Sequence, residues 1–197
     1  MGKKMTYDLT PIKTNEEAAR FETCVRASGG YNLDMENLNL KVLPSLAPIH
    51  VDYSARKATP VKNVQVNEAY TTSDTAKTLK IYKGSLAYVG MFIGNGTKGA
   101  KITAIDTSNK DFDSLTLDAA VGANLAKDAV LFEATAVGGT KQKNKANALN
   151  YAYTKVEEGA TVTGVIQIYE IKRSKIGYPV FSDKDVEDLG ARYHFVD

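Results

Sequence analysis

The sequence predicts a mainly β fold: a small antiparallel β-barrel or sandwich with an N-terminal helix-plus-extended arm and a short C-terminal helix. The first observation is alternation, since residues 101–106 and 114–119 alternate side chains as half-buried strands do. The second is spacing, because about seven or eight such short runs are separated by turn residues, as in small barrels and sandwiches. The third is a hairpin, in which run 161–171 pairs with run 149–156 across a Glu-Glu-Gly turn.

Composition excludes several classes of protein. Of the 197 residues, 43% are hydrophobic and 24% are charged, which is typical of a folded domain and excludes wholesale disorder. The net charge of +2 predicts no specific nucleic-acid partner and no attraction to anionic membranes. No apolar run approaches the roughly 20 residues of a membrane span, and no secretory signal opens the chain. The single cysteine, Cys24, cannot form an internal disulfide, which indicates synthesis in a reducing cytoplasm.

An amphipathic helix is predicted over about 15–28. Thr14 and Glu17 fit a capping box, in which the threonine hydroxyl accepts from the backbone N–H of Glu17. The apolar side chains on the expected inner face are Ala18, Phe21 and Val25. Two glycines at 29–30 end the helix. A lone helix of about twelve residues is marginal, so this one needs a surface to pack against.

Residues 1–59 as a whole are predicted to form an arm, and residues 60–197 the barrel or sandwich domain. After the helix, prolines favour an extended backbone, yet the run is too apolar for a free linker. It is therefore an extended strap that lies either along a neighbouring protein or along its own domain. The residues expected to contact a partner are Phe21, Val25, Leu38, Leu40, Val42, Leu43, Leu46 and Ile49.

The C-terminal helix has clear boundaries in the sequence. Ser182 is expected to cap a short helix that runs through Leu189, and Gly190 ends it. Residues 191–197 then return to strand character. Four tyrosines on or beside the strongest strands are expected in the core or, less often, at a contact: Tyr151, Tyr153, Tyr169 and Tyr178.

One glycine motif resembles a nucleotide site but lacks its context. Residues 94–99 read G-N-G-T-K-G after an apolar strand. A dinucleotide fingerprint needs a helix to begin at the third glycine, so that its N-terminus holds the pyrophosphate. Here an alternating strand follows, so the glycines are expected to serve a hairpin turn.

Candidate metal ligands do not form a recognised pattern. Asp106, Asp111 and Asp113 share one loop, but Lys110 and Leu117 occupy positions where an EF-hand needs oxygen ligands. Turn-forming aspartates are the favoured interpretation, and a weak metal site of another type stays open. His50 and His194 lie far apart with no zinc-ligand spacing. No metal and no cofactor is therefore expected.

No residue pattern predicts catalysis. Cys24 lies beside the apolar face of the expected helix, where a buried structural thiol is far more common than a nucleophile. The sequence contains neither a G-x-S-x-G elbow nor a phosphate-binding P-loop. Three alternating lysines at 141–145 without interleaved aromatics indicate solvated loop charge rather than a nucleic-acid patch.

The central stretch GAKITAIDTSNKDFDSLTLDAAVGANLAKDAVLFEA resembles the β domain of head-decoration and head-fibre proteins of tailed bacteriophages. The similar features are an ITAIDTS-like strand, an acidic turn, a D-x-L-T-L strand and a strand ending near L-x-E. The segments ALNYAYTKVEEGATVTGVIQIYEI and SDKDVEDLGARYHFV resemble the family's later strands and final helix. The resemblance covers residues 60–197 and is closest to proteins from phages and prophages of gut Bacteroidota.

This resemblance implies a virion structural protein with no catalytic residues. The chain would be made in the bacterial host cytoplasm and would bind the outside of the icosahedral shell, as a capsid decoration or head-fibre subunit. Expected partners are the major capsid protein, further copies of itself in a dimer or trimer, and other head-fibre proteins. The alternative is a non-enzymatic β-rich binding module, either a glycan or cell-surface adhesin or a cellular scaffold.

Overall fold

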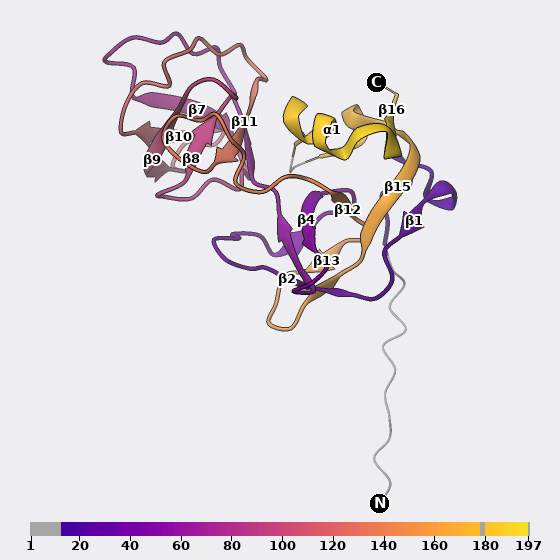
Figure 1. The fold of residues 1–197 in the computed structure, drawn as a ribbon. Coiled ribbons are helices and arrows are strands. Elements are labelled where there is room, and N and C mark those ends of the chain that lie inside the picture. Colours follow the sequence, from indigo (N-terminus) through magenta and orange to yellow (C-terminus); the bar gives the residue numbers. More distant parts are fainter. Residues whose placement is uncertain (1–12, 178–179, 197) are drawn as a thin grey trace, which may run out of the picture.

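The computed structural model describes residues 13–177 and 180–196, and these form two lobes (Figure 1). We call residues 63–142 the inserted lobe and the remainder the base lobe. The chain leaves the sheet of the base lobe after residue 60, builds the inserted lobe, and returns to that same sheet at residue 148. The mainly β prediction is confirmed, and the arrangement is sandwich-like. No helix among these residues is long and apolar enough to cross a membrane.

The base lobe is built on an eight-stranded sheet in the order β1-β15-β12-β4-β5-β2-β14, with β16 pairing beside β15. Its strands are β1 (Val25–Arg26), β2 (Tyr31–Leu33), β4 (Pro48–Asp52), β5 (Lys57–Pro60), β12 (Ala148–Asn150), β14 (Thr161–Val162), β15 (Gly164–Ile171) and β16 (Tyr193–Phe195). The β2–β5 and β15–β16 pairs are parallel, and the others are antiparallel. A separate two-stranded sheet joins β3 (Val42–Leu43) to β13 (Thr154–Lys155).

The inserted lobe is built on a six-stranded antiparallel sheet in the order β6-β11-β8-β9-β10-β7. Its strands are β6 (Asn63–Gln65), β7 (Thr78–Tyr82), β8 (Phe92–Gly94), β9 (Gly99–Asp106), β10 (Phe112–Leu117) and β11 (Val130–Ala134). A bridge between Val66 and Ile81 brings the two outer strands together, so the sheet curls around its own core. Ile102, Leu115 and Leu117 are buried in that core, as the alternation of β9 and β10 predicted.

The predicted hairpin between 149–156 and 161–171 forms only near its β12 end. Leu149 pairs with Val165 in the register of an antiparallel ladder. Farther toward the turn the two segments separate, because β13 pairs with β3 and β14 pairs with β2. Local alternation therefore identified the strands, but strands from the first sixty residues supply a partner for each of β12, β13, β14 and β15.

The predicted helix over 15–28 is wrong. The backbone makes a turn at 16–18, Ala19 bridges Ile171, and a short 3-10 turn η1 (Phe21–Thr23) leads into β1. The Thr14 hydroxyl lies 3.4 Å from the Glu16 carboxylate instead of capping a helix. A helix of this length is marginal alone, and pairing along β15 satisfies the backbone groups of the segment instead.

The boundary between an arm and a domain at residue 59 is also wrong for the described residues. Strands β1, β2, β4 and β5 precede it, and they share one sheet with strands that follow residue 147. Two cores bury the apolar residues of the segment against β12, β14 and β15. Of the two interpretations of the strap, the described part therefore lies along its own fold.

The predicted C-terminal helix is confirmed as α1 (Asp183–Leu189), which is followed by η3 (Gly190–Arg192). Ser182 and Asp185 form a reciprocal capping box, and Gly190 takes a positive φ of 63° at the C-cap. Another 3-10 turn, η2 (Arg173–Lys175), follows β15. The helix lies between the two lobes in Figure 1, above the sheet that contains β12 and β15.

Candidate functional site

The glycine motif at 94–99 forms a tight turn, as predicted. Gly94 and Gly99 pair across β8 and β9, and Gly96 takes a positive φ of 96° between them. The side-chain oxygen of Asn95 accepts hydrogen bonds from the backbone of the turn, at 2.9 Å from Lys98 N. Backbone approaches closely here, since a Cβ at Gly94 would lie 2.3 Å from Cα of Gly139. The glycines therefore serve packing between backbones and do not form a phosphate cradle.

Two of the three aspartates of the 106–113 loop have side-chain partners, and Asp111 donates its backbone N–H to Asn109 Oδ1 at 2.8 Å. Asp106 accepts from the backbone N–H of Ser108 at 2.9 Å, which is the expected Asx turn. Asp113 forms an ion pair with Lys83 at 2.8 Å. Among the described residues, no three His, Cys, Asp or Glu side chains gather as metal ligands.

The histidines and the cysteine have separate surroundings. His50 Nδ1 lies 2.8 Å from the carbonyl oxygen of Lys145, and His194 stacks on Tyr169 with ring centroids 4.7 Å apart. Burial raises the pKa of the Cys24 thiol, which disfavours the thiolate that a nucleophile requires. This environment fits the structural role predicted for the cysteine.

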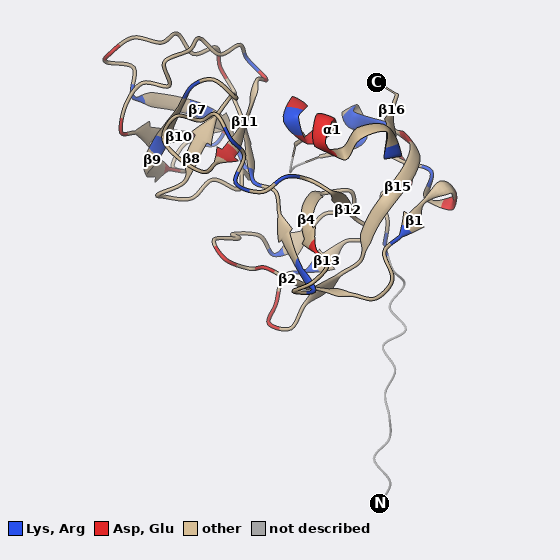
Figure 2. Ribbon diagram, viewed as in Figure 1, with Lys and Arg blue, Asp and Glu red and all other residues tan. Residues whose placement is uncertain are grey.

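The lysines at 141–145 do not form a single basic patch. Lys143 pairs with Glu133 at 2.9 Å and Lys145 with Asp188 at 3.5 Å. Figure 2 shows acidic and basic residues interspersed over both lobes. The arrangement fits solvated and paired loop charge.

The eight predicted contact residues separate into three groups. Leu43, Leu46 and Ile49 are fully buried in the base lobe, so the expectation that they contact a partner is wrong. The residues that are half-buried against those cores are Phe21, Leu38 and Leu40. Only Val25 and Val42 are exposed, at 47% and 44%.

We expect Ile49→Ala to act on stability. Ile49 is fully buried in the middle of the base sheet, so its truncation should lower the free energy of unfolding by about 2–5 kcal/mol through a cavity. Val42→Ala is the matched control and should change it by less than about 0.5 kcal/mol, because Val42 is solvent-exposed. Urea denaturation measures both values. Equal effects at the two positions would contradict the assignment of Ile49 to the core.

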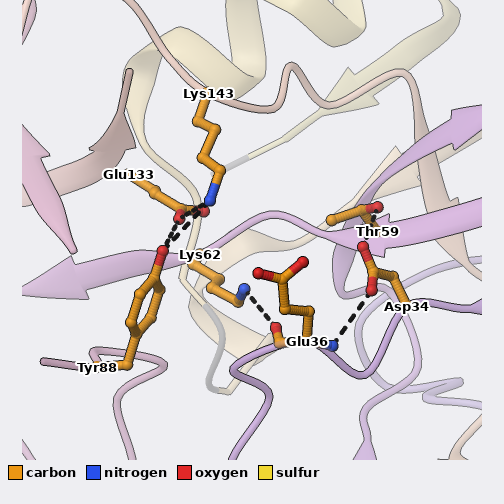
Figure 3. Close-up of polar contacts among 7 residues, drawn as sticks. All are labelled: Asp34, Glu36, Thr59, Lys62, Tyr88, Glu133 and Lys143. Atoms are coloured by element: carbon orange, nitrogen blue, oxygen red, sulfur yellow. Dashed lines mark hydrogen bonds and ion pairs between the residues drawn. The ribbon is translucent and has the colours of Figure 1, made fainter. Parts of the chain in front are cut away.

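A buried polar cluster joins the two lobes, and we call it the junction (Figure 3). Glu133 of β11 is only 3% exposed, and its Oε1 accepts from the Tyr88 hydroxyl at 2.5 Å and from Lys143 Nζ at 2.9 Å. Burial and the bond to Glu133 raise the pKa of Tyr88. The same carboxylate holds the pKa of Lys143 above its ordinary value, against the effect of burial. The junction thus keeps one lysine charged and one tyrosine protonated.

Lys62 extends the junction into the base lobe. Its ammonium group donates to the carbonyl oxygen of Glu36 at 2.9 Å and lies 5.1 Å from the centroid of the Tyr88 ring (Figure 3). Burial lowers the pKa of Lys62, and the charge of Glu133 opposes that shift. The 34–39 loop, the chain crossover at residue 62 and the inserted lobe are therefore held together by hydrogen bonds and charge.

Asp34 anchors the other end of the same loop. It accepts from Thr59 Oγ1 at 3.0 Å and pairs with Lys57 at 3.0 Å. Burial raises the pKa of Asp34, but the hydrogen bonds from Lys57, the Glu36 N–H and Thr59 outweigh it and leave the pKa below its ordinary value. The loop is consequently tied to β5 as well as to the junction.

A groove of about 720 Å³ opens beside the junction, between the two lobes. The residues that line it are Met35, Asn37, Leu38 and Asn39 of the base lobe and Gly84, Ser85, Ala87, Tyr88, Ile105, Thr107 and Asp113 of the inserted lobe. Met35, Leu38 and Ile105 supply apolar surface, and asparagine, serine and threonine side chains supply hydrogen-bonding groups. The one charged residue in the lining, Asp113, is already paired with Lys83. Mixed apolar and amide surface of this kind suits a protein segment better than a reacting small molecule.

The predicted aromatics lie in different settings. Tyr151 is half-buried against Phe21 and under the Arg26 guanidinium, while Tyr153 and Tyr169 are exposed. Tyr178 lies outside the described residues. The sequence analysis did not include Met35 among the contact residues, although Met35 is exposed and lines the groove. The available signal was that Met35 lies three residues before Leu38, which was included.

Comparison with protein families gave a match that covers most of the chain. A family model described as "Head fiber protein", from phages, matches residues 2–174. The match includes the N-terminal segment, which the resemblance had left out, and it ends before α1 and β16. Comparison with curated proteins and with solved structures gave no match.

Proposed function

Because this chain belongs to the head fiber protein family of phages, we propose that it is mounted on the outside of the capsid as a head-fibre subunit. Membership of this family indicates a virion structural protein. The family match over residues 2–174 is the observation on which the proposal rests. Its partner on the shell would be the major capsid protein. Other fibre proteins would attach to the subunit, which would serve as their base.

The way the two lobes are held together supports a mechanical role. The sequence motifs that could suggest chemistry form a glycine turn, an Asx turn and an ion pair in the described structure. The two lobes are joined by the junction and by α1, which limits their relative motion. A subunit that is repeated over a symmetric shell needs only modest individual contacts, because multivalency raises the effective concentration at each of them.

The groove between the lobes is the proposed contact with the capsid. It combines Met35 and Leu38 from one lobe with Tyr88 and Ile105 from the other, so an inserted capsid segment would touch both lobes at once. A deletion of residues 1–59 is not a usable test, since it would remove strands of the base sheet. Point substitutions in the groove leave that sheet intact.

The experiment measures binding of the purified chain to capsids from a phage that lacks this gene. We expect Met35→Glu to weaken binding at least about tenfold, because a charge then enters the apolar part of the groove. Val137→Glu is the control, since Val137 is similarly exposed and lies outside the groove lining. Equal binding of both variants would reject the groove as the contact.

Quantitative mass spectrometry of purified virions tests the function itself. A copy number that is a simple fraction of the major capsid protein is expected for a subunit on the symmetric shell. Absence of the chain from virions would overturn the proposed function, whatever the groove variants do.

A further inference from the structure

The turn between β8 and β9 contains a chemically labile pair of residues, Asn95 and Gly96. An asparagine is labile before a glycine, because no Cβ on the glycine hinders its backbone nitrogen from reaching the side-chain carbonyl carbon of the asparagine. Every other asparagine in the sequence is followed by a residue that has a Cβ. Asn95 is also exposed to solvent. The labile pair therefore lies at an accessible hairpin turn.

The reaction open to this pair is deamidation. The backbone nitrogen of Gly96 loses its proton and bonds to the side-chain carbonyl carbon of Asn95, while the bond from that carbon to Nδ2 breaks. Ammonia leaves with Nδ2 and takes up the proton, and a cyclic succinimide remains. Water then opens the succinimide at either of its carbonyl groups and gives aspartate or isoaspartate. Water is the co-reactant, and nothing is oxidised or reduced.

The folded turn holds both reacting groups back from this step. The Gly96 N–H donates to the carbonyl oxygen of Gly139 at 2.9 Å, so the attacking nitrogen is already engaged. Asn95 Oδ1 accepts from the N–H and the hydroxyl of Thr97, both at 3.0 Å, and from the N–H of Lys98 at 2.9 Å. These bonds fix the carboxamide in an Asx turn. The reaction consequently requires that the turn opens first.

The turn is covered by residues 136–142, which we call the cover. The Gly139 N–H donates to the carbonyl oxygen of Ala136 at 3.1 Å, which bends the cover back on itself. A Cβ at Gly94 would lie 2.3 Å from Cα of Gly139, and one at Gly99 would lie 2.7 Å from the same atom. The cover and the turn are therefore in direct backbone contact. A movement that lifts the cover frees the Gly96 N–H.

The two products differ in whether they fit under the cover. Isoaspartate passes the main chain through its Cβ, so it adds a carbon atom to the backbone beside Gly94, where Gly139 leaves no space for one. Aspartate keeps the natural backbone, and its carboxylate can still accept from the N–H groups of Thr97 and Lys98. Isoaspartate is therefore the product that prevents the turn from closing again.

We infer that Asn95 is a deamidation site gated by the cover. The closed turn protects the site, and each opening allows some chains to react. Because ammonia is lost, the reaction is irreversible, so the modified fraction records how often the cover has lifted. This inference concerns the inserted lobe alone, and it does not depend on binding to a capsid.

Peptide mass spectrometry of the full chain, after incubation at mildly alkaline pH, tests the inference. We expect Asn95 to deamidate at least about tenfold more slowly in the folded chain than in the chain unfolded by urea, because opening of the turn limits the reactive fraction. Asn109 is the internal reference, since it is also exposed but precedes Lys110. It should react more slowly than Asn95 in urea.

Two substitutions open the gate to different degrees. Gly139→Ala should raise the folded-state rate at Asn95 at least about tenfold, because its Cβ would lie 2.3 Å from the Lys98 carbonyl oxygen and lift the cover. Thr97→Ala removes the hydroxyl donor from an exposed position and should raise the rate several-fold. Gly159→Ala is the control, since its added Cβ meets no atom within 4 Å and should leave the rate unchanged.

Circular dichroism verifies that each variant is folded, and Thr97→Ala decides the matter if Gly139→Ala is not. Equal rates at Asn95 in the folded and the unfolded chain would overturn the inference. So would a slow reaction in urea, or a folded-state rate that Thr97→Ala does not raise. A rate raised equally by Gly159→Ala would also overturn it, because general destabilisation would then explain the effect.

Discussion

Replacing Gly139 with alanine is expected to lower the free energy of unfolding by about 4 kcal/mol or more, among the largest effects of any single substitution. A Cβ at this position would lie 2.3 Å from the carbonyl oxygen of Lys98 and 2.7 Å from Cα of Gly99. Both contacts are with backbone, so no side chain can rotate away to relieve them. Gly139 also has a positive φ of 61°, which adds strain for any residue with a Cβ.

Gly159→Ala is the control for the backbone conformation alone. Gly159 has a positive φ of 78°, and an added Cβ there would meet no atom within 4 Å. We expect this substitution to cost only about 1–2 kcal/mol, which is the penalty of the left-handed conformation. Urea denaturation compares the two variants. Equal losses of unfolding free energy in the two variants would show that the close approach of Gly139 to the β8–β9 turn does not add to the cost of Gly139→Ala.

Removing the Asp185 carboxylate is expected to loosen the C-terminal helix from both lobes and to cost about 3 kcal/mol in Asp185→Ala. Asp185 is fully buried, and its Oδ2 accepts from Ser182 and from Asn63 Nδ2 at 2.6 Å, while its Oδ1 accepts from Gln142 Nε2 at 2.9 Å. Alanine would remove the acceptor for all of these donors. Thermal unfolding and amide hydrogen exchange of α1 report the loss.

Asp185→Asn separates the contribution of the hydrogen bonds to stability from the contribution of the negative charge. The amide oxygen can replace Oδ2, and rotation of the Gln142 amide can present an acceptor to the new NH₂ group, so the loss should be much smaller than in the alanine variant. Burial raises the pKa of Asp185, so its contribution to stability is fullest below the unfolded pKa and falls as pH rises through the folded pKa. The stability of Asp185→Asn relative to the natural chain should therefore rise as the pH increases above about 4, the ordinary pKa of an aspartate. A pH-independent difference would contradict burial of a charged carboxylate.

Local patterns predicted the elements whose determinants are local. Alternation identified β9 and β10, and the Ser182–Asp185 spacing identified the cap of α1, because each of these signals lies within a few residues of the structure it forms. The helix predicted over 15–28 failed for the opposite reason. Its segment satisfies its backbone groups against β15, about 140 residues away, and no local propensity carries that information.

The candidate contact surface was only partly predictable. The sequence shows that Leu43, Leu46 and Ile49 are hydrophobic, but it does not show whether they pack against a partner or against their own sheet. The structure places them in the base core. Period-two alternation predicted a strand over 161–171. It could not indicate which face of that strand the rest of the chain would cover, since covering depends on the topology of the sheet.

The insertion of one lobe into the sheet of the other determines the order in which the chain can complete its structure during synthesis. All strands of the inserted lobe lie between residues 63 and 134, so the ribosome delivers them together. The base sheet is completed later in synthesis, because β1, β12 and β16 all pair with β15, which ends at Ile171. β1 therefore emerges long before its partner β15, and β4 and β2 emerge long before β12 and β14. A nascent chain thus carries a complete inserted lobe while strand edges of the base sheet are still unpaired. Unpaired strand edges can pair with other chains, so a β-rich protein is most prone to aggregate during this interval.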